Sequence, residues 1–295
     1  MKSGFVSIIG RPNTGKSTLI NSLVGEKIAI ISDKPQTTRN LIQGIYNEDD
    51  TQIIFVDTPG IHKPVDKMGQ ALNGQTYYSI NDVDIVLLVV DASTAYGKGD
   101  QYIIDKLKYV KKPVFLILNK IDKLTDEKIL LKINEYKDLY EFAEIIPISA
   151  LKNDNTDRLI KVLKTYLPDS MKYFYGDEKT SSDLDFRLAE IVREKIFLHT
   201  EDEVPHSISC TLSSISEEND IVYIYVDIIV DRDSLKKIIL GRNGTMIKTI
   251  GIEARLDMEK LLNKKVYLEL YCKTLKKWRD KEKYIKNLGY IVKDE

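Results

Sequence analysis

Eight residues near the N-terminus, GRPNTGKS at positions 10–17, combine residue types that together can bind phosphate. Glycine at both ends of a four-residue interval lets backbone N–H groups curl around phosphate oxygens, and a following helix adds the partial positive charge of its N-terminus. We expect Lys16 to reach the outer phosphates of a nucleotide and the Ser17 hydroxyl to bind Mg²⁺. A chance turn is the alternative, but a strand-like VSII before the motif and a helical pattern after it favour a phosphate loop. Its predicted contact residues are Gly10, Arg11, Pro12, Asn13, Thr14, Gly15, Lys16, Ser17 and Thr18.

Two later stretches favour guanine as the base of that nucleotide. In NKID the Asp122 carboxylate can accept two hydrogen bonds, which matches the adjacent ring N1–H and exocyclic amine of guanine and leaves adenine unpaired. In ISAL the Ala150 N–H can face the guanine carbonyl. Either stretch alone fits an ordinary turn, but both follow strand-like runs in the expected order. The predicted base-site residues are Asn119, Lys120, Ile121, Asp122, Ser149, Ala150 and Leu151.

The stretch DTPG at 57–60 and the loop PQTTR at 35–39 supply the remaining chemistry. We expect Asp57 to bind Mg²⁺ through water and the Gly60 N–H to contact the γ-phosphate, with Thr58, Pro59 and Ile61 beside them. A threonine of the loop would complete the Mg²⁺ shell; we favour Thr38, keep Thr37 as the alternative, and retain a loop without a ligand as a third possibility. The predicted catalytic residues are Lys16, Thr38 and Gly60, and the predicted Mg²⁺ ligands are Ser17, Thr38 and Asp57.

These motifs require a sheet whose strand ends converge. Six apolar runs, four of them rich in Ile, Val and Leu without alternation, are separated by helical stretches such as DQYIIDKLKYV. This order is typical of an α/β fold with a mostly parallel six-stranded sheet covered on both faces. The third run follows the second after the acidic turn YNEDDTQ, so one antiparallel edge is expected. The runs are FVSII, LIQGIY, QIIFVD, DIVLLVV, PVFLILN and EIIPIS.

The pattern stops near Leu167-Pro168, and the following PDSMKYFYGDEKTSSD has no clear period. We therefore predict a nucleotide-binding domain at 1–168, a linker at 169–185 and a second domain at 186–295. The second domain combines a helix, an alternating hairpin, two helices around a glycine turn, and a strand, which indicates an α+β fold.

The glycine turn of the second domain, Gly241 to Gly244, has the form G-x-x-G between two helices. Such a unit can grip the backbone of single-stranded nucleic acid, although a G-x-x-G alone is also a frequent turn. Basic neighbours favour the nucleic-acid interpretation. Three isoleucines, Ile238, Ile247 and Ile250, could line a groove for bases or could pack in the core. The candidate RNA-binding residues are Gly241, Arg242, Asn243, Gly244, Lys248 and Arg255.

Charge along the 295 residues is unevenly distributed, although the formal net charge is −1. Residues 236–286 contain fifteen Lys and Arg against six Asp and Glu, whereas residues 171–235 contain six against fifteen. The basic block fits a nucleic-acid footprint, or a solvated helical face. No apolar run approaches the roughly 20 residues that cross a bilayer. Two cysteines and three histidines without ligand spacing argue against a zinc site and fit a reducing compartment.

Taken together, these segments resemble the Era GTPases of bacteria. The resemblance is carried by GRPNTGKS, PQTTR, DTPG, NKID and SAL, followed by AEIVREK, EVPHS and IGIEAR, and it covers nearly the whole chain. It implies a Ras-like G domain followed by a type II KH domain, GTP or GDP with Mg²⁺ as ligands, and slow GTP hydrolysis. It further implies a monomer that binds the 3′ end of 16S rRNA rather than DNA, and that assists assembly of the 30S ribosomal subunit. The implied location is the cytoplasm, with peripheral association at the inner face of the cell membrane.

Three positions bear on the resemblance, and only the last of them departs from the family. Ile61 stands where other Ras-like proteins have a glutamine that orients water, and it resembles Era in being apolar. Asn13 matches the family position linked to a K⁺ ion that stimulates hydrolysis. Asp154 stands where the family commonly has glycine. Two other functions fit parts of the sequence. One is an RNA-binding assembly factor for which turnover is incidental, and the other is an ATP-dependent enzyme such as a kinase, against which Asp122 argues.

Overall fold

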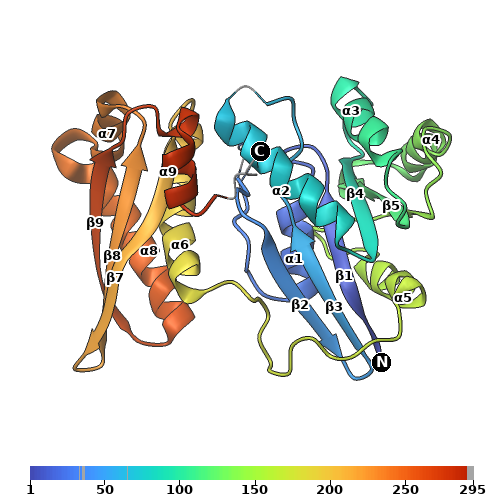
Figure 1. Ribbon diagram of the computed structural model, residues 1–295, viewed down its shortest axis with the longest axis horizontal. Helices are drawn as coiled ribbons and strands as arrows, with labels where there is room; N and C mark the ends of the chain where they lie inside the picture. The colour runs from blue at the N-terminus through green and yellow to red at the C-terminus, as the bar shows by residue number, and fades with distance from the viewer. Residues whose placement is uncertain (33, 35–36, 65, 291–295) are drawn as a thin grey trace. The chain divides into compact units, whose positions relative to one another are not determined.

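The protein divides into two compact units, shown in Figure 1. The computed structural model describes residues 1–32, 34, 37–64 and 66–290. The first unit holds the residues up to 181 except 66–68, and the second holds 66–68 and the residues from 182 onward. Of the stretch 169–185 that the sequence predicts as a linker, residues up to 181 therefore belong to the first unit.

The first unit is built on a six-stranded sheet in the order β2-β3-β1-β4-β5-β6. The inner strands β1, β3, β4 and β5 are mostly or wholly buried, as strands covered on both faces must be, and the edge strands β2 and β6 are only partly buried. The β2–β3 pair is antiparallel and the other pairs are parallel. This arrangement confirms the predicted α/β fold. The strands are β1 (Lys2–Ile9), β2 (Ile42–Glu48), β3 (Thr51–Asp57), β4 (Ile85–Asp91), β5 (Val114–Asn119) and β6 (Glu144–Pro147).

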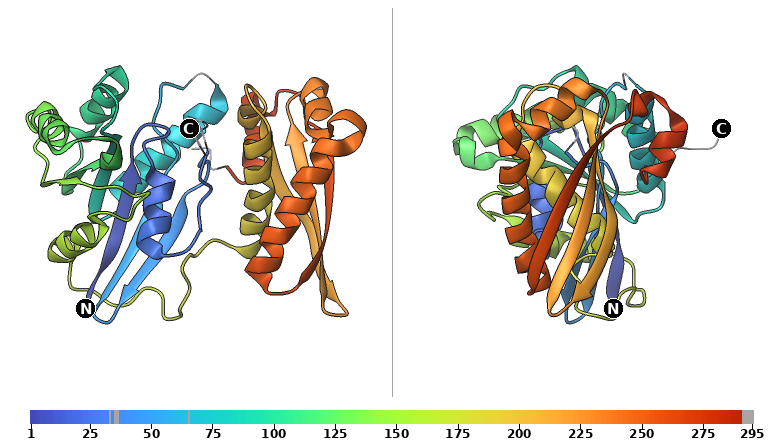
Figure 2. Two further views of the ribbon diagram at one scale, coloured as in Figure 1. Left: turned by 180° about the vertical axis from the view of Figure 1, so that it is seen from behind. Right: turned by 90° about the vertical axis from the view of Figure 1, so that its left-hand side faces the viewer.

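Helices cover both faces of this sheet, and Figures 1 and 2 show α1 and α2 on opposite sides. On one face Ile103, Ile104 and Leu107 of α3 pack against Val86 and Leu116 of the central strands. The carboxyl ends of β1, β3 and β5 consequently open toward one rim, where the loops carrying the motifs begin. The helices are α1 (Lys16–Val24), α2 (Lys67–Asn81), α3 (Lys98–Leu107), α4 (Asp126–Tyr136) and α5 (Thr156–Tyr166).

The second unit has a three-stranded sheet in the order β7-β8-β9, in which β7–β8 is antiparallel and β8–β9 is parallel. Its helices α6 and α8 lie on one face of the sheet (Figures 1 and 2). There Val192, Ile196, Ile250 and Ala254 pack against alternate strand residues such as Ile224. The order α-β-β-α-α-β confirms the predicted KH domain of type II. Its elements are α6 (Leu184–His199), β7 (Ile208–Glu218), β8 (Ile221–Val230), α7 (Asp233–Leu240), α8 (Thr245–Leu262), β9 (Lys265–Thr274) and α9 (Glu282–Asn287).

Candidate nucleotide site and nucleic-acid interface

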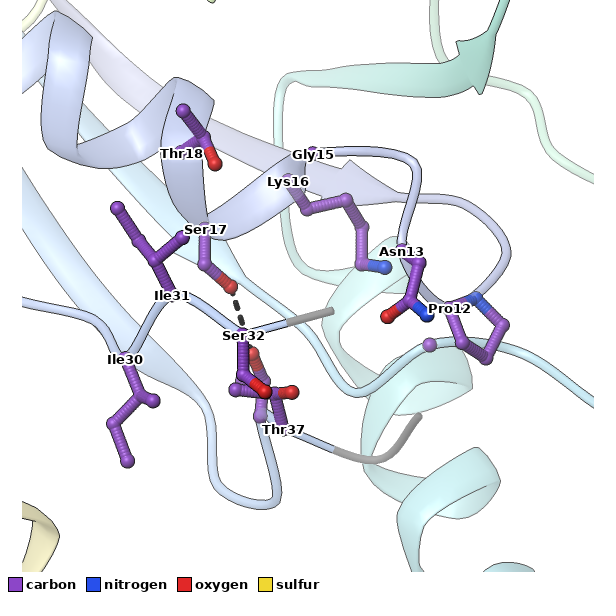
Figure 3. A pocket seen from close by; sticks show the side chains of 12 residues that line it. Pro12, Asn13, Gly15, Lys16, Ser17, Thr18, Ile30, Ile31, Ser32 and Thr37 are labelled. Carbon is purple, nitrogen blue, oxygen red and sulfur yellow. Dashed lines mark hydrogen bonds between the residues drawn. The ribbon is translucent and has the colours of Figure 1, made fainter. Parts of the chain in front are cut away.

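The phosphate loop connects β1 to α1 and wraps around the amine of Lys16 (Figure 3). The Lys16 Nζ donates to the carbonyl of Arg11 at 2.9 Å and to that of Gly10 at 3.4 Å. Gly15 precedes the helix with a φ of 93°, and a Cβ there would lie 2.3 Å from the Asn119 side chain, so only glycine fits. The loop is thereby closed into the turn that backbone donors need to surround a phosphate.

Three predicted Mg²⁺ ligands converge beside the loop. The Ser17 Oγ donates to Asp57 Oδ2 at 2.9 Å, the Thr38 Oγ1 donates to the same oxygen at 3.1 Å, and the two hydroxyls are 3.0 Å apart. The Thr37 Oγ1 instead donates to the Lys34 carbonyl at 2.6 Å. The structure therefore favours Thr38 over its neighbour. Pro35 and Gln36 of the same predicted loop lie outside the described residues.

Burial shapes the charges of this cluster. Asp57 is fully buried, and burial raises the pKa of its carboxyl against the lowering effects of Lys16, the Ser17 and Thr38 hydroxyls and the Thr58 N–H. Burial lowers the pKa of the Lys16 amine to about 8, against the raising effect of Asp57. The Asp57 Oδ1 has no hydrogen-bond partner among the described residues. A buried carboxylate oxygen without a partner, beside two hydroxyls, fits the oxygen preference of Mg²⁺.

The guanine motifs meet the phosphate loop through Asn119. Its Nδ2 donates to the Thr14 carbonyl at 2.8 Å, and its Oδ1 accepts the Ala150 N–H at 3.0 Å. The exposed Asp122 is oriented by the Ser149 hydroxyl, which donates to its Oδ1 at 2.5 Å. The arrangement links both nucleotide-binding loops and leaves the Asp122 carboxylate facing outward, as base recognition requires.

Three other base-site residues lie in the same two loops. The Ala150 N–H, predicted to face a guanine carbonyl, already donates to Asn119, so a guanine would have to share it. The Leu151 side chain is 71% exposed on the next turn, while Ile121 opens a short 3-10 helix with its N–H bonded to the Ile148 carbonyl. Reciprocal backbone hydrogen bonds between Ser149 and Asp154 close this loop, so an aspartate is accommodated where the family commonly has glycine.

In the second unit the G-x-x-G turn joins α7 to α8. Gly241 has a φ of 72°, and a Cβ there would lie 2.6 Å from the Met246 Cβ and 2.8 Å from its backbone N. Asn243 and Gly244 also have positive φ values, 53° and 75°. The turn therefore leaves its backbone accessible to a nucleic-acid strand, and Arg242 and Asn243 are exposed at its tip.

A groove runs beside this turn between α8 and β9. Ile250 is fully buried and packs in the core, whereas Ile247 lines the groove and Ile238 on α7 is 48% exposed. The sequence left these roles open, and the structure separates them. The groove brings the predicted Lys248 and Arg255 together with apolar side chains; it is lined by Ile247, Lys248, Gly251, Ile252, Arg255, Leu268, Glu269 and Leu270.

Comparison with known proteins agrees with this geometry. A family model described as "50S ribosome-binding GTPase" matches residues 5–120, and a KH domain model matches residues 203–279. A crystal structure of Era in complex with MgGDPNP and nucleotides 1506–1542 of 16S ribosomal RNA is 40% identical, with a TM-score of 0.96, and the match covers 99% of this chain and 100% of that one. A single-residue variant of Aquifex aeolicus Era bound to GDP·AlF4⁻ gives the same identity, TM-score and coverage.

This chain belongs to the Era family. Era structures have been described with guanine nucleotides, and the residues of this chain fit a guanine nucleotide with Mg²⁺ at the corresponding motifs. Among the described residues no helix is long and apolar enough to cross a membrane. Within the same residues no group of three or more His, Cys, Asp or Glu side chains could hold a metal ion.

The remaining predicted residues of this Era-family site secure the loops. Thr58 Oγ1 donates to the Ile8 carbonyl at 2.8 Å, and the Pro59 carbonyl accepts Thr76 Oγ1 at 3.0 Å. A Cβ on Gly60 would lie 2.8 Å from the Pro12 backbone N, so the glycine lets the two loops approach. The Ile61 N–H donates to the Gly10 carbonyl at 3.1 Å. A pocket beside the phosphate loop (Figure 3) is lined by Pro12, Asn13, Gly15, Lys16, Ser17, Thr18, Ile30, Ile31, Ser32, Thr37, Thr38 and Gly60.

Two carboxylates of this site were missed by sequence reasoning. Asp91 Oδ2 pairs with Lys120 at 2.7 Å, and the Lys120 Nζ also donates to the Asn13 carbonyl at 2.7 Å. Asp100 Oδ2 accepts the Arg11 guanidinium at 2.9 Å. Asp91 ends β4 at the same rim as the motifs, and the sequence could have indicated it, because this carboxylate directly follows a strand-like apolar run. Asp100 carries no such signal, because its partner is 89 residues away.

Proposed function

We propose that this chain is a GTP-hydrolysing switch whose KH domain binds the 3′ end of 16S rRNA during assembly of the 30S subunit. The observation that carries the proposal is the convergence of Ser17, Thr38 and Asp57 beside the phosphate loop. Thr38 belongs to the loop before β2, so its place in this cluster depends on that loop. A loop held by nucleotide contacts and released after hydrolysis is the usual device of GTPase switches.

The reaction assigned to the site is in-line attack of water on the γ-phosphate of GTP. Lys16 holds a positive charge in the phosphate loop, and the Gly60 N–H would donate to the γ-phosphate. Mg²⁺, held through Ser17, Thr38 and Asp57, would supply further positive charge to the phosphates. Ile61 is 2% exposed and packs among apolar side chains, so it offers no hydrogen bond to the attacking water. Intrinsic turnover should therefore be slow.

Asn13 is the residue of the site that we assign to K⁺ stimulation. Its φ of 64° is left-handed, and its carbonyl accepts the Lys120 amine, which fixes the loop at this point. A monovalent cation beside this residue would offset the charge that develops on the phosphates. We expect faster GTP hydrolysis in K⁺ than in Na⁺ buffer and no such difference in Asn13→Ala. Equal rates of the unaltered protein in both buffers reject this assignment.

The RNA assignment is supported by two independent facts. The groove beside the G-x-x-G turn combines apolar walls with Lys248 and Arg255, and a full-length relative has been crystallised with nucleotides 1506–1542 of 16S rRNA. The family model names the 50S subunit, but it matches the GTPase part and not the KH domain. We therefore favour the small subunit as partner. We also propose a monomer as the active form and a cytoplasmic location with peripheral membrane association, as the resemblance to the Era family implies.

Adjacent threonines provide a matched pair for testing the switch. Thr38→Ala removes a hydroxyl from the Mg²⁺ cluster, whereas Thr37→Ala removes one that contacts the Lys34 backbone. We expect Thr38→Ala to lower Mg²⁺-dependent GTP hydrolysis at least about tenfold, by analogy with other losses of transition-state charge stabilisation, and Thr37→Ala to change it little. Equal effects of the two variants contradict the assignment. RNA crosslinking with GTP or GDP bound then tests whether the nucleotide controls the KH domain.

A further inference from the structure

The outer face of the KH sheet, opposite α6 and α8, carries a row of tyrosines. Strand alternation places Tyr223 and Tyr225 of β8 and Tyr267 and Tyr271 of β9 on this face. The ring centroids of Tyr223 and Tyr267 are 5.5 Å apart, and those of Tyr225 and Tyr267 are 6.4 Å apart. Tyr267 and Tyr271 are 48% and 60% exposed. We call these four residues the tyrosine row.

Positive charge accompanies the exposed end of the row. The Lys236 amine lies 5.9 Å from the Tyr271 ring centroid, and the Lys273 amine lies 5.5 Å from it. Asp227 on the same face is paired with Lys273 at 2.5 Å. Glu269 lies between the two tyrosines of β9 and disfavours phosphate there, so the lysine side is the better path for a polyanion. Exposed rings next to lysine amines are the combination that binds single-stranded nucleic acid without sequence preference.

The tyrosine row and the G-x-x-G groove share strand β9. Leu268 and Leu270 point into the groove, whereas Tyr267 and Tyr271 point to the opposite side. A single-stranded RNA that leaves the groove can therefore continue across β9, the edge strand of the sheet, onto the tyrosine row. Tyr267 and Tyr271 are four residues apart, about 13 Å at the strand rise of roughly 3.3 Å per residue, so bases stacked on the two rings would be non-adjacent in an extended single strand.

We propose that the tyrosine row is a second RNA-binding surface, on which bases of single-stranded RNA stack after leaving the groove. The inference depends on the proposed RNA-binding function of the groove and extends it to a different face. Tyrosine is also favoured in strands because it packs across them. Cross-strand packing accounts for the partly buried Tyr223 and Tyr225, but it does not require the exposure of Tyr267 and Tyr271 or the lysines above Tyr271.

The test compares RNA lengths on the full chain by fluorescence anisotropy. The probes are fluorescein-labelled A/C-only RNAs, which do not pair with themselves, of five nucleotides, close to the four that a KH groove clamps, and of fourteen. In the double variant Tyr267→Ala and Tyr271→Ala we expect affinity for the 14-mer to fall at least about fivefold per tyrosine. Affinity for the 5-mer should be unchanged. The double Phe variant should keep affinity for both probes, because the stacking rings remain. Tyr109→Ala, at an exposed tyrosine in the turn after α3, should behave as the unaltered protein.

Each other outcome counts against the proposal. An unchanged 14-mer affinity in the Ala variant, an equal loss for both lengths, or a loss that the Phe variant shares would overturn it. A tyrosine-dependent self-association without a change in RNA affinity would assign the face to a second copy of this chain. Arg242→Glu at the G-x-x-G tip separates this proposal from the proposed function. It should weaken both probes if the groove binds RNA, whereas failure of the unaltered protein to bind either probe refutes the groove itself.

Discussion

Replacing Asn119 should destabilise the first unit and its nucleotide site together. Its side chain is 2% exposed and satisfies two buried backbone groups, the Thr14 carbonyl and the Ala150 N–H. Asn119→Ala leaves both without that partner, and each unmade buried hydrogen bond costs about 1–3 kcal/mol. The expected loss is therefore about 2–6 kcal/mol in the free energy of unfolding, which is a large part of the roughly 5–15 kcal/mol that holds a typical domain together.

Asn119→Asp separates the two hydrogen bonds. The carboxylate can still accept the Ala150 N–H, but it presents an oxygen to the Thr14 carbonyl at a position where the amide donates over 2.8 Å. Because two acceptors then face each other in a buried site, the substitution should not restore stability. Asn134→Ala, on the exposed side of α4, is the control and should leave the unfolding free energy within about 0.5 kcal/mol.

Urea denaturation followed by circular dichroism measures the unfolding free energy, and binding of a fluorescent GDP analogue measures the site. The single Trp278 lies in the second unit, so its fluorescence reports that unit and should show an unchanged midpoint in the Asn119 variants. A loss below about 1 kcal/mol for Asn119→Ala would refute the reasoning. Weakened GDP binding in a variant that keeps its full free energy of unfolding would also refute it, because the same two hydrogen bonds of Asn119 are expected to support both stability and GDP binding.

Three further predictions concern other parts of the chain. Asp122→Asn should shift nucleotide preference from GTP to XTP, because xanthine has a carbonyl in place of the guanine amine and an amide can donate to it; competition binding measures this, and retained GTP preference contradicts it. Burial raises the pKa of the Cys272 thiol to about 11, so iodoacetamide at pH 8 should label the less buried Cys210 first; equal labelling of both cysteines, read by mass spectrometry, would count against this. The free energy of unfolding should also fall as pH rises from about 9 to about 11, because the thiol of the unfolded chain loses its proton at a lower pH than the folded one. Gln52→Ala should speed amide hydrogen exchange at Tyr173 and Phe174, whose N–H groups donate to Gln52 Oε1 at 2.8 and 3.0 Å. Unchanged exchange would show that Gln52 does not hold this segment.

Much of the nucleotide site could be predicted from the sequence because its chemistry is local. Glycine, lysine and serine must be adjacent to surround a phosphate, and Asp122 must lie three residues after Asn119 to orient the base edge. Strand runs preceded these motifs, so the parallel sheet gave each motif a strand end. The α+β order of the second domain was equally accessible, since its helices and strands are visible as changes of hydrophobic period, whereas the KH type followed from the resemblance to the Era family.

Other features depend on geometry that residue types do not specify. Thr37 and Thr38 are chemically identical neighbours, and only the backbone of the loop decides which hydroxyl reaches Asp57. Ile247 and Ile250 both fit one helical apolar face, and only the packing of α8 against its neighbours decides that Ile247 lines the groove while Ile250 is buried in the core. The domain boundaries at 168 and 185 also stay predictions, because residue types alone do not specify where the packing of one domain ends.

The stretch after Pro168 shows why a segment without periodicity can still be ordered by its partners. Its hydrogen bonds come from the first unit: Ile45 N–H donates to the Lys179 carbonyl at 2.8 Å, and Thr180 Oγ1 donates to the Gln43 carbonyl at 2.6 Å. These contacts lie along β2, an edge strand that would otherwise offer unpaired backbone groups to other chains. The opposite edge, β6, is four residues long and needs less cover. Because the covering contacts come from another part of the chain, the segment needs neither alternation nor helical spacing, and its own sequence therefore resembles a free linker.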